Sequence, residues 1–563
     1  MSDSTETATT EDDSIDRLAD DYWQHHLAHQ PTNAHLLGRY EWAGDYEQES
    51  REAEDAEIEA LRAFAGRAEA LGAPGAADLD DQQRITREVL LADARTRVDV
   101  LETRLTEMAA DPIFGAQVTL GIIAPMLALP DAEVAEALVS KYAGIGRSFR
   151  QVAERQRAGV AAGRVPPRFA VLGTVEQIDE LLATPVADDP LLLTATPPSG
   201  LDVDGWKARL RQVVDDEVRP GLAAYRDVLR DEVLPAARPD DRPGLTHLAG
   251  GDAAYSALLR YFTTTDKSAQ EIHDIGLAQI EKLGAEYRAL GPEVVGTDNL
   301  DDIFTAMRSD PALHFTRGEQ LVEASEVAMQ RAWDAMPAWF EVLPQARCAV
   351  QATMTGAKAF YFPPASDGSR GGTFFINVDD PTSWGTFELE SMAFHEGIPG
   401  HHLQLAIAGE LTGVPEFRKH LHNAAYAEGW GLYTERLADE MGLYSGPVDR
   451  MGMYAADSMR ACRLVVDTGL HALGWSREQA VDYMLANSPL AEGVVRPEVD
   501  RYIVSPGQAC SYMVGRLEIE RMRAEAEERQ GSGFEVKAFH SAVLDSGSLP
   551  LGVLDEVVRA RLA

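Results

Sequence analysis

Two stretches near the middle of the sequence hold the residue types of a catalytic metal centre. Residues 395–402 read HEGIPGHH, and residues 427–435 read AEGWGLYTE. Two imidazoles, a carboxylate beside the first and a carboxylate on a later helix can give zinc three protein ligands, an open position for water and a general base. The pattern predicts that His395, His401 and Glu428 bind zinc and that Glu396 moves the proton.

The spacing of the two histidines does not suit a straight helix. In the usual motif the histidines lie four residues apart on one face, but here the fourth residue after His395 is Pro399. On a regular helix His401 would point about 120° away from His395, and His402 would lie about 10 Å along the axis. Pro399 and the glycines on either side must distort the helix. A two-residue bulge would bring in His401, which we favour, and a three-residue bulge would bring in His402.

Further segments carry a resemblance to a known family. Residues 395–404, 426–435 and 501–512 and, more weakly, residues 30–38 resemble the bacterial family called domain of unknown function 885. The segment around Glu428 also resembles the stretch that carries the third zinc ligand in gluzincin aminopeptidases, and the Gly-His pair at 400–401 resembles the end of the motif in helical oligopeptidases. The resemblance implies a mostly helical, zinc-peptidase-like enzyme, and it supplies no substrate.

Several polar residues could assist the metal. Tyr502 and Tyr512 are candidates to stabilise an oxyanion, although a tyrosine is more often a packing residue. Arg463, Asp467 and His471 follow one another at every fourth position, so one of them could orient a zinc-bound imidazole, or the three could form a structural ion-pair row. Glu435 could support the site from behind or lie on a solvated face.

The sequence before the first histidine changes to a β pattern. The aromatic runs 359–362 and 373–378 flank a polar loop and predict two strands. Asp380 followed by Pro381 predicts an N-cap that opens the helix carrying His395.

The second of these strands suggests how a substrate could bind. We expect residues 373–378 to pair with an extended substrate backbone, so Phe375 and Asn377 are candidate substrate-binding residues. Arg370, in the loop, could hold a substrate carboxylate. A purely structural hairpin is the alternative.

The remaining pattern is helical. Apolar residues recur at helical spacing in eight stretches; these are 52–71, 82–105, 131–159, 204–234, 449–473, 476–486, 497–504 and 508–530. We therefore expect a mainly α fold, namely a large helical zinc-peptidase-like fold with a deep cleft and one small β-sheet beside the metal. Residues 1–16 are expected to be a disordered acidic segment, 17–290 a helical cleft wall and 291–563 the catalytic half, all within one family domain from about 17 to 563.

Composition limits the partners. The 563 residues carry a formal charge of -40, which disfavours nucleic acids and anionic lipid surfaces. No long apolar run suggests a membrane span. Cys348, Cys462 and Cys510 have no zinc-binding spacing and suit a reducing compartment, so a cytoplasmic location is expected. The oligomeric state is not predicted.

These observations favour a zinc-dependent hydrolase that cleaves amide bonds of small peptides. The alternatives are a zinc amidohydrolase acting on a non-peptide amide of specialised metabolism, and a metal-retaining binding protein without turnover. Glu396 argues against the last alternative, because a site that only holds a metal needs ligands but no base.

Overall fold

The computed structural model describes residues 14–73, 78–364 and 370–563. The described chain is mainly helical with one small sheet, which confirms the helical fold class. Most of the acidic segment expected at residues 1–16 lies outside the described residues. Among the described residues no helix combines the length and the apolar character that crossing a membrane requires.

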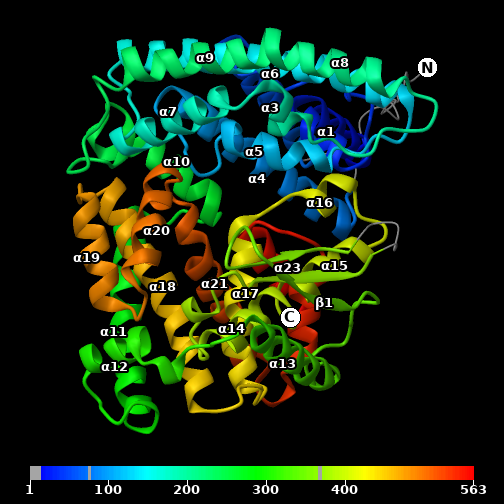
Figure 1. The fold of residues 1–563 in the computed structure, drawn as a ribbon. Coiled ribbons are helices and arrows are strands. Elements are labelled where there is room, and N and C mark those ends of the chain that lie inside the picture. Colours follow the sequence, from blue (N-terminus) through cyan, green and yellow to red (C-terminus); the bar gives the residue numbers. More distant parts are fainter. Residues whose placement is uncertain (1–13, 74–77, 365–369) are drawn as a thin grey trace, which may run out of the picture. The chain divides into compact units, whose positions relative to one another are not determined.

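The chain divides into two compact units. Unit 1 is Met1–Asp78 with Asp93–Ala254, and unit 2 is Leu79–Ala92 with Tyr255–Ala563. The division falls after Ala254 and not near residue 290, because helix α11 (Ala269–Val294) packs along α18 (Pro447–His471) inside unit 2 (Figure 1).

The first helices of the chain build unit 1 and begin unit 2. They are α1 (Ile15–His29), α2 (Pro31–Leu36), α3 (Arg51–Leu71), α4 (Asp81–Glu102), α5 (Ala116–Ile123), α6 (Ala132–Ala161), α7 (Arg168–Ala183), α8 (Val203–Val213) and α9 (Arg219–Val228). The stretch expected at 204–234 is helical, with α-helical turns and two π-helical segments, Val214–Val218 and Leu229–Val233. It runs along α6 (Figure 1).

Most helices of unit 2 follow residue 254. They are α10 (Gly251–Thr263), α11, α12 (Leu300–Ser309), α13 (Gly318–Trp339), α14 (Glu388–Glu396), α15 (His401–Glu410), α16 (Glu416–His420), α17 (Ala424–Glu440), α18, α19 (Arg477–Asn487), α20 (Glu492–Val504), α21 (Ser511–Gln530), α22 (Val536–Leu544) and α23 (Leu551–Arg561). Nearly every residue of α18 after its first turn is buried, as expected of a helix packed on all sides.

The sheet has three strands, of which two were expected. They are β1 (Cys348–Thr353), β2 (Ala359–Phe362) and β3 (Gly372–Asn377), in the order β1-β3-β2. The pattern of residues 348–353 did not predict β1, because all of its residues are partly or fully exposed and it lacks the aromatic run of the other two strands.

The position of β3 overturns one expectation. It pairs in parallel with β1 on one side and antiparallel with β2 on the other. Its backbone groups are therefore used within the sheet. The prediction that residues 373–378 pair with a substrate backbone is wrong.

The predicted start of the histidine-bearing helix is also wrong. The Asp380 side chain accepts a hydrogen bond from the Thr382 backbone N–H, but it caps only the short 3-10 turn Pro381–Ser383. Helix α14 begins at Glu388, so Asp380 and Pro381 open a separate turn.

Candidate metal centre

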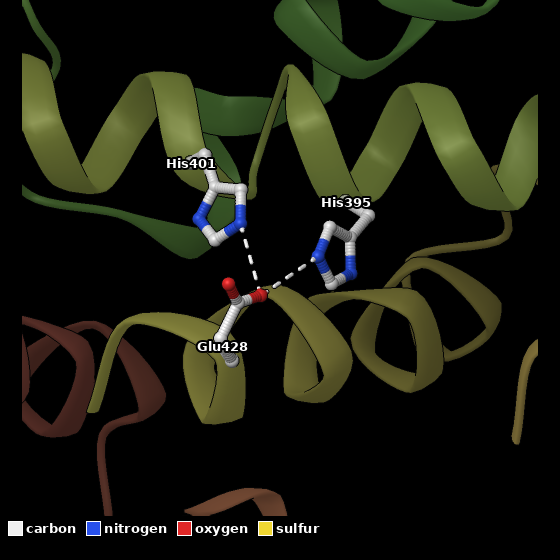
Figure 2. A group of neighbouring side chains, drawn as sticks. All are labelled: His395, His401 and Glu428. Atoms are coloured by element: carbon white, nitrogen blue, oxygen red, sulfur yellow. Dashed lines mark ion pairs between the residues drawn. The ribbon is translucent and has the colours of Figure 1, made fainter. Parts of the chain in front are cut away.

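The two candidate histidines belong to two consecutive helices. Helix α14 ends at Glu396, just after His395, and α15 begins at His401. Residues 397–400 between them are not helical. The predicted distortion is therefore a complete interruption and not a bulge within one helix, and it lets both imidazoles turn toward α17 (Figure 2).

The imidazoles of His395 and His401 converge on Glu428 of α17. Nε2 of each ring lies 3.5 Å from Oε2 of Glu428. Among the described residues, these three side chains form the group of ligand atoms that could hold a metal ion, all within 4.8 Å of one another. Figure 2 shows the two rings approaching the carboxylate from neighbouring helices. The structure thus brings together the three residues predicted as ligands.

His402 faces elsewhere and is fully buried. Its Nε2 lies 3.0 Å from the carbonyl oxygen of Ala346, which can only accept, so Nε2 donates. Burial lowers the pKa of His402 to about 4, so the ring is neutral and its Nδ1 accepts from the Tyr361 hydroxyl at 2.8 Å. Both ring nitrogens are occupied, and this geometry favours His401 over His402 as a ligand.

Glu435 positions His395 from behind. Its carboxylate Oε1 accepts from Nδ1 of His395 at 2.8 Å, and its Oε2 accepts from the Ser391 hydroxyl at 2.6 Å. Glu435 is buried, so it does not lie on a solvated face. The hydrogen bond holds a proton on Nδ1 of His395 and turns Nε2 toward Glu428, where it could bind a metal ion. Nδ1 of His401 has no hydrogen-bond partner among the described residues.

Gly431 makes room for the His395 ring. A Cβ atom at this position would lie 2.7 Å from Cε1 and 2.8 Å from Nε2 of that ring. The imidazole therefore packs directly on the backbone of α17, one helical turn from Glu428. Sequence reasoning missed this role, although the glycines at 429 and 431 inside a helical pattern were a usable signal.

The charges of the site favour a bound cation. Burial opposes protonation of His395, but the carboxylates of Glu428 and Glu435 outweigh it and raise its pKa to about 9. Burial raises the pKa of Glu428, but the two imidazoles hold it well below its usual range. Without a metal the carboxylates retain a proton on His395, which a metal ion would have to displace.

Glu396 lies next to the triad at the end of α14. It is partly exposed, and its charge contributes to the raised pKa of His395. Burial, and then the charge of Glu396, also raise the pKa of the Cys348 thiol to about 12. The charge of the Glu396 carboxylate therefore influences both His395 of the triad and Cys348 at the start of β1.

The two candidate tyrosines have different surroundings. Tyr502 is fully buried, and its hydroxyl accepts from Nε of Arg463 at 2.9 Å and donates to Glu498 at 2.6 Å. Tyr512 is partly exposed on α21, and burial followed by the charge of Glu428 raises its pKa. Tyr512 is thus the tyrosine that the structure places within electrostatic reach of the triad.

Arg463, Asp467 and His471 make hydrogen bonds with residues outside the triad. Asp467 accepts from the Tyr255 hydroxyl at 2.6 Å, and Nε2 of His471 contacts the Tyr502 carbonyl oxygen at 3.0 Å. Arg463 contacts Tyr502 and Glu498. Asp467 and His471 therefore serve the packing of α18.

The three candidate substrate residues have local contacts. Arg370 is exposed and donates to the carbonyl oxygens of Gly371 and Pro363. The ring of Phe375 stacks on Phe360 at 4.9 Å between centroids. Asn377 donates to the Gly356 carbonyl oxygen at 3.1 Å. Their roles toward a substrate stay predictions.

Comparison with known proteins gives one family and two similar structures. The family described as "bacterial protein of unknown function (DUF885)" matches residues 31–558. A structure described as "the putative lipoprotein from Colwellia psychrerythraea" has a TM-score of 0.86 at 23% identity, covering 98% of this chain and 99% of that chain. A second, of "a putative lipoprotein of unknown function from Shewanella oneidensis", has a TM-score of 0.75 at 19% identity, covering 96% and 99%. No curated protein matches the sequence.

These similarities concern the fold. At such identities the two structures show a shared fold. Their description as lipoproteins contradicts the cytoplasmic location expected for this chain, and we withdraw that expectation.

Proposed function

Because the chain belongs to the bacterial family DUF885, whose description assigns no function, we propose one from the site itself: a zinc-dependent hydrolase that cleaves amide bonds of small peptides. The observation that carries the proposal is the convergence of His395, His401 and Glu428. A zinc-peptidase-like fold with a deep cleft, related to gluzincins and helical zinc oligopeptidases, is part of the same proposal.

The donor set suits zinc. Two imidazoles and one carboxylate are the three-ligand set of a catalytic zinc site. Oε2 of Glu428 lies 3.5 Å from each Nε2, and all three ligand atoms lie within 4.8 Å of one another, close enough to hold one ion after a small adjustment. The carboxylate of Glu435 behind His395 is the partner that zinc-bound histidines usually have.

Each side chain has a role in amide hydrolysis. Zinc, when bound, would supply Lewis-acid activation of water and of the scissile carbonyl. Glu396 accepts the proton of the attacking water and passes it to the leaving amine. The Tyr512 hydroxyl, whose raised pKa keeps it protonated also in alkaline solution, donates a hydrogen bond to the developing oxyanion.

The experiment compares metal content and turnover in variants. We expect one equivalent of zinc by elemental analysis in the wild-type chain, and loss of zinc in His401→Ala but not in a folded His402→Ala. Glu396→Gln should keep the zinc and lower the rate of cleavage of a defined dipeptide mixture by at least about 10².

The matched control is Glu410→Gln at the end of the neighbouring helix α15, which should keep both zinc and activity. If the zinc-loaded wild-type chain cleaves no peptide, or if Glu396→Gln is as fast as wild type, the proposed mechanism fails. Cleavage of non-peptide amides alone would favour the amidohydrolase alternative.

A further inference from the structure

Two buried arginines of α18 hold unused hydrogen-bond donors. Arg460 is 8% exposed and Arg463 is 5% exposed. Nε of Arg460 and Nη1 of Arg463 are buried without a hydrogen-bond partner among the described residues. Buried guanidinium donors are normally satisfied, so two such donors on neighbouring turns of one helix are available to an acceptor group of a ligand.

Both guanidinium groups lie against Tyr512. The central carbon of Arg463 is 4.6 Å from the centroid of its ring, and that of Arg460 is 5.9 Å away. The ring covers the guanidinium groups and contributes no oxygen acceptor to the two unpaired nitrogens. Tyr512 is partly exposed, so the residue that packs on the arginine pair is itself reached by solvent.

The arginine pair lies next to the triad of His395, His401 and Glu428. Nη2 of Arg460 lies 3.8 Å from Oε1 of Glu435, the same oxygen that accepts from His395. On the other side, the charge of Glu428 acts on Tyr512. The unused donors therefore border the triad on the side of Tyr512.

The local charges leave the cations incompletely balanced. Glu498 is shared between Arg463 and Arg501. Glu435 already accepts from Ser391 and His395, and its contact with Arg460 is long. The guanidinium groups of Arg460 and Arg463 therefore each share their carboxylate with another partner.

We propose that Arg460 and Arg463 bind a carboxylate of the substrate, so that the enzyme acts on amides with a free carboxylate beside the scissile bond, such as the last peptide bond of a short peptide. The inference rests on the proposed hydrolase function. A planar carboxylate matches the guanidinium fork and accepts two hydrogen bonds at once. Both arginines lie against Tyr512. If the scissile carbonyl binds between Tyr512 and the triad of His395, His401 and Glu428, the carboxylate of the following, C-terminal residue is then directed toward the arginines.

The test compares N-acetyl dipeptides that end in a free acid with the same dipeptides ending in an amide. Calorimetric titration of the metal-free chain measures binding without turnover, and the zinc-loaded chain measures cleavage. We expect the acids to bind at least about tenfold more tightly than the amides, and to be cleaved with a lower KM. Arg460→Gln should remove this difference, and Arg460→Lys should retain part of it.

The matched control is Arg450→Gln, which removes a guanidinium from the same helix where it pairs with Asp439 away from Tyr512. It should keep the preference for acids. Zinc content and circular dichroism of each variant show whether the site and the fold persist. If Arg460→Gln does not fold, the comparison of acids with amides in the wild-type chain still tests whether the protein binds a substrate carboxylate.

Equal binding of acids and amides, or binding of neither, overturns the carboxylate site. If the zinc-loaded chain then still cleaves amides, the hydrolase proposal stands without it. Preferential binding of acids without any cleavage supports the carboxylate site and refutes the hydrolase proposal.

Discussion

At the scale of single residues, the His395 imidazole is fixed on two sides. Glu435 accepts from Nδ1, and the backbone at Gly431 supports the ring. His401 lacks such a partner for its Nδ1 among the described residues. The orientation of His395 therefore sets the geometry of the triad, and Glu435 is the side chain that controls it.

Glu435→Gln tests this control. Glutamine keeps the size but weakens the charge-assisted hydrogen bond to Nδ1 of His395, so zinc affinity should fall by about 10- to 100-fold. Competition with a chelator measures the affinity. The control Glu440→Gln changes an exposed carboxylate of the same helix that pairs with Arg523, and should leave the affinity unchanged. An unchanged affinity in Glu435→Gln would mean that packing alone orients His395.

At the scale of elements, glycines allow α17 to approach its neighbours closely. A Cβ at Gly515 of α21 would lie 1.9 Å from the Ala425 carbonyl oxygen, and one at Gly429 would lie 2.6 Å from the Gly515 Cα. The backbones of α17 and α21 therefore touch. This contact brings Tyr512, three residues before Gly515, toward Glu428, one residue before Gly429.

Gly431→Ala tests the close approach of α17 to α14. Alanine is a better helix former than glycine by about 1 kcal/mol, so any loss comes from the clash with the His395 ring. Zinc affinity should fall at least about tenfold, measured by the same chelator competition. Gly409→Ala is the control, because a Cβ there meets nothing within 4 Å. Full zinc affinity in Gly431→Ala would show that the His395 ring can shift and still coordinate zinc together with His401 and Glu428.

The sequence allowed most helices and the grouping of His395, His401 and Glu428 to be predicted, because both depend on local patterns. Helical periodicity and capping residues lie within one element, and His395, His401 and Glu428 lie in two short motifs. The central position of β3 was not predictable, because it depends on β1, whose pattern is weak. The grouping of Arg460 with Tyr512 depends on the packing of α18 on α21, which no spacing reveals.

At the scale of the whole molecule, all three candidate ligands belong to unit 2. A ligand that binds only the folded chain stabilises it by about 4 kcal/mol at a concentration 1,000 times its Kd. Since zinc would join α14, α15 and α17, this stabilisation should be concentrated in the helices of unit 2.

Hydrogen exchange measures where zinc stabilises the chain. On addition of zinc, amides of α14, α15 and α17 should exchange more slowly, and those of α6 in unit 1 should serve as the internal reference. His401→Ala should show no zinc-dependent change. Equal protection of α6, or the same protection in His401→Ala, would contradict a single site at the triad.

The two parts of unit 2, Leu79–Ala92 and Tyr255–Ala563, are synthesised at different times. The segment Leu79–Ala92 is made before most of unit 1, yet its contacts lie in unit 2, where the buried Arg418 donates to the Gln82 side chain and the Thr86 hydroxyl. Arg418 follows Thr86 by 332 residues, so at ribosomal speed the segment waits about 20 to 60 s for this partner. During translation Gln82 and Thr86 therefore have to stay hydrated until the rest of unit 2 has been made, whereas all the residues of unit 1 have been made by Ala254.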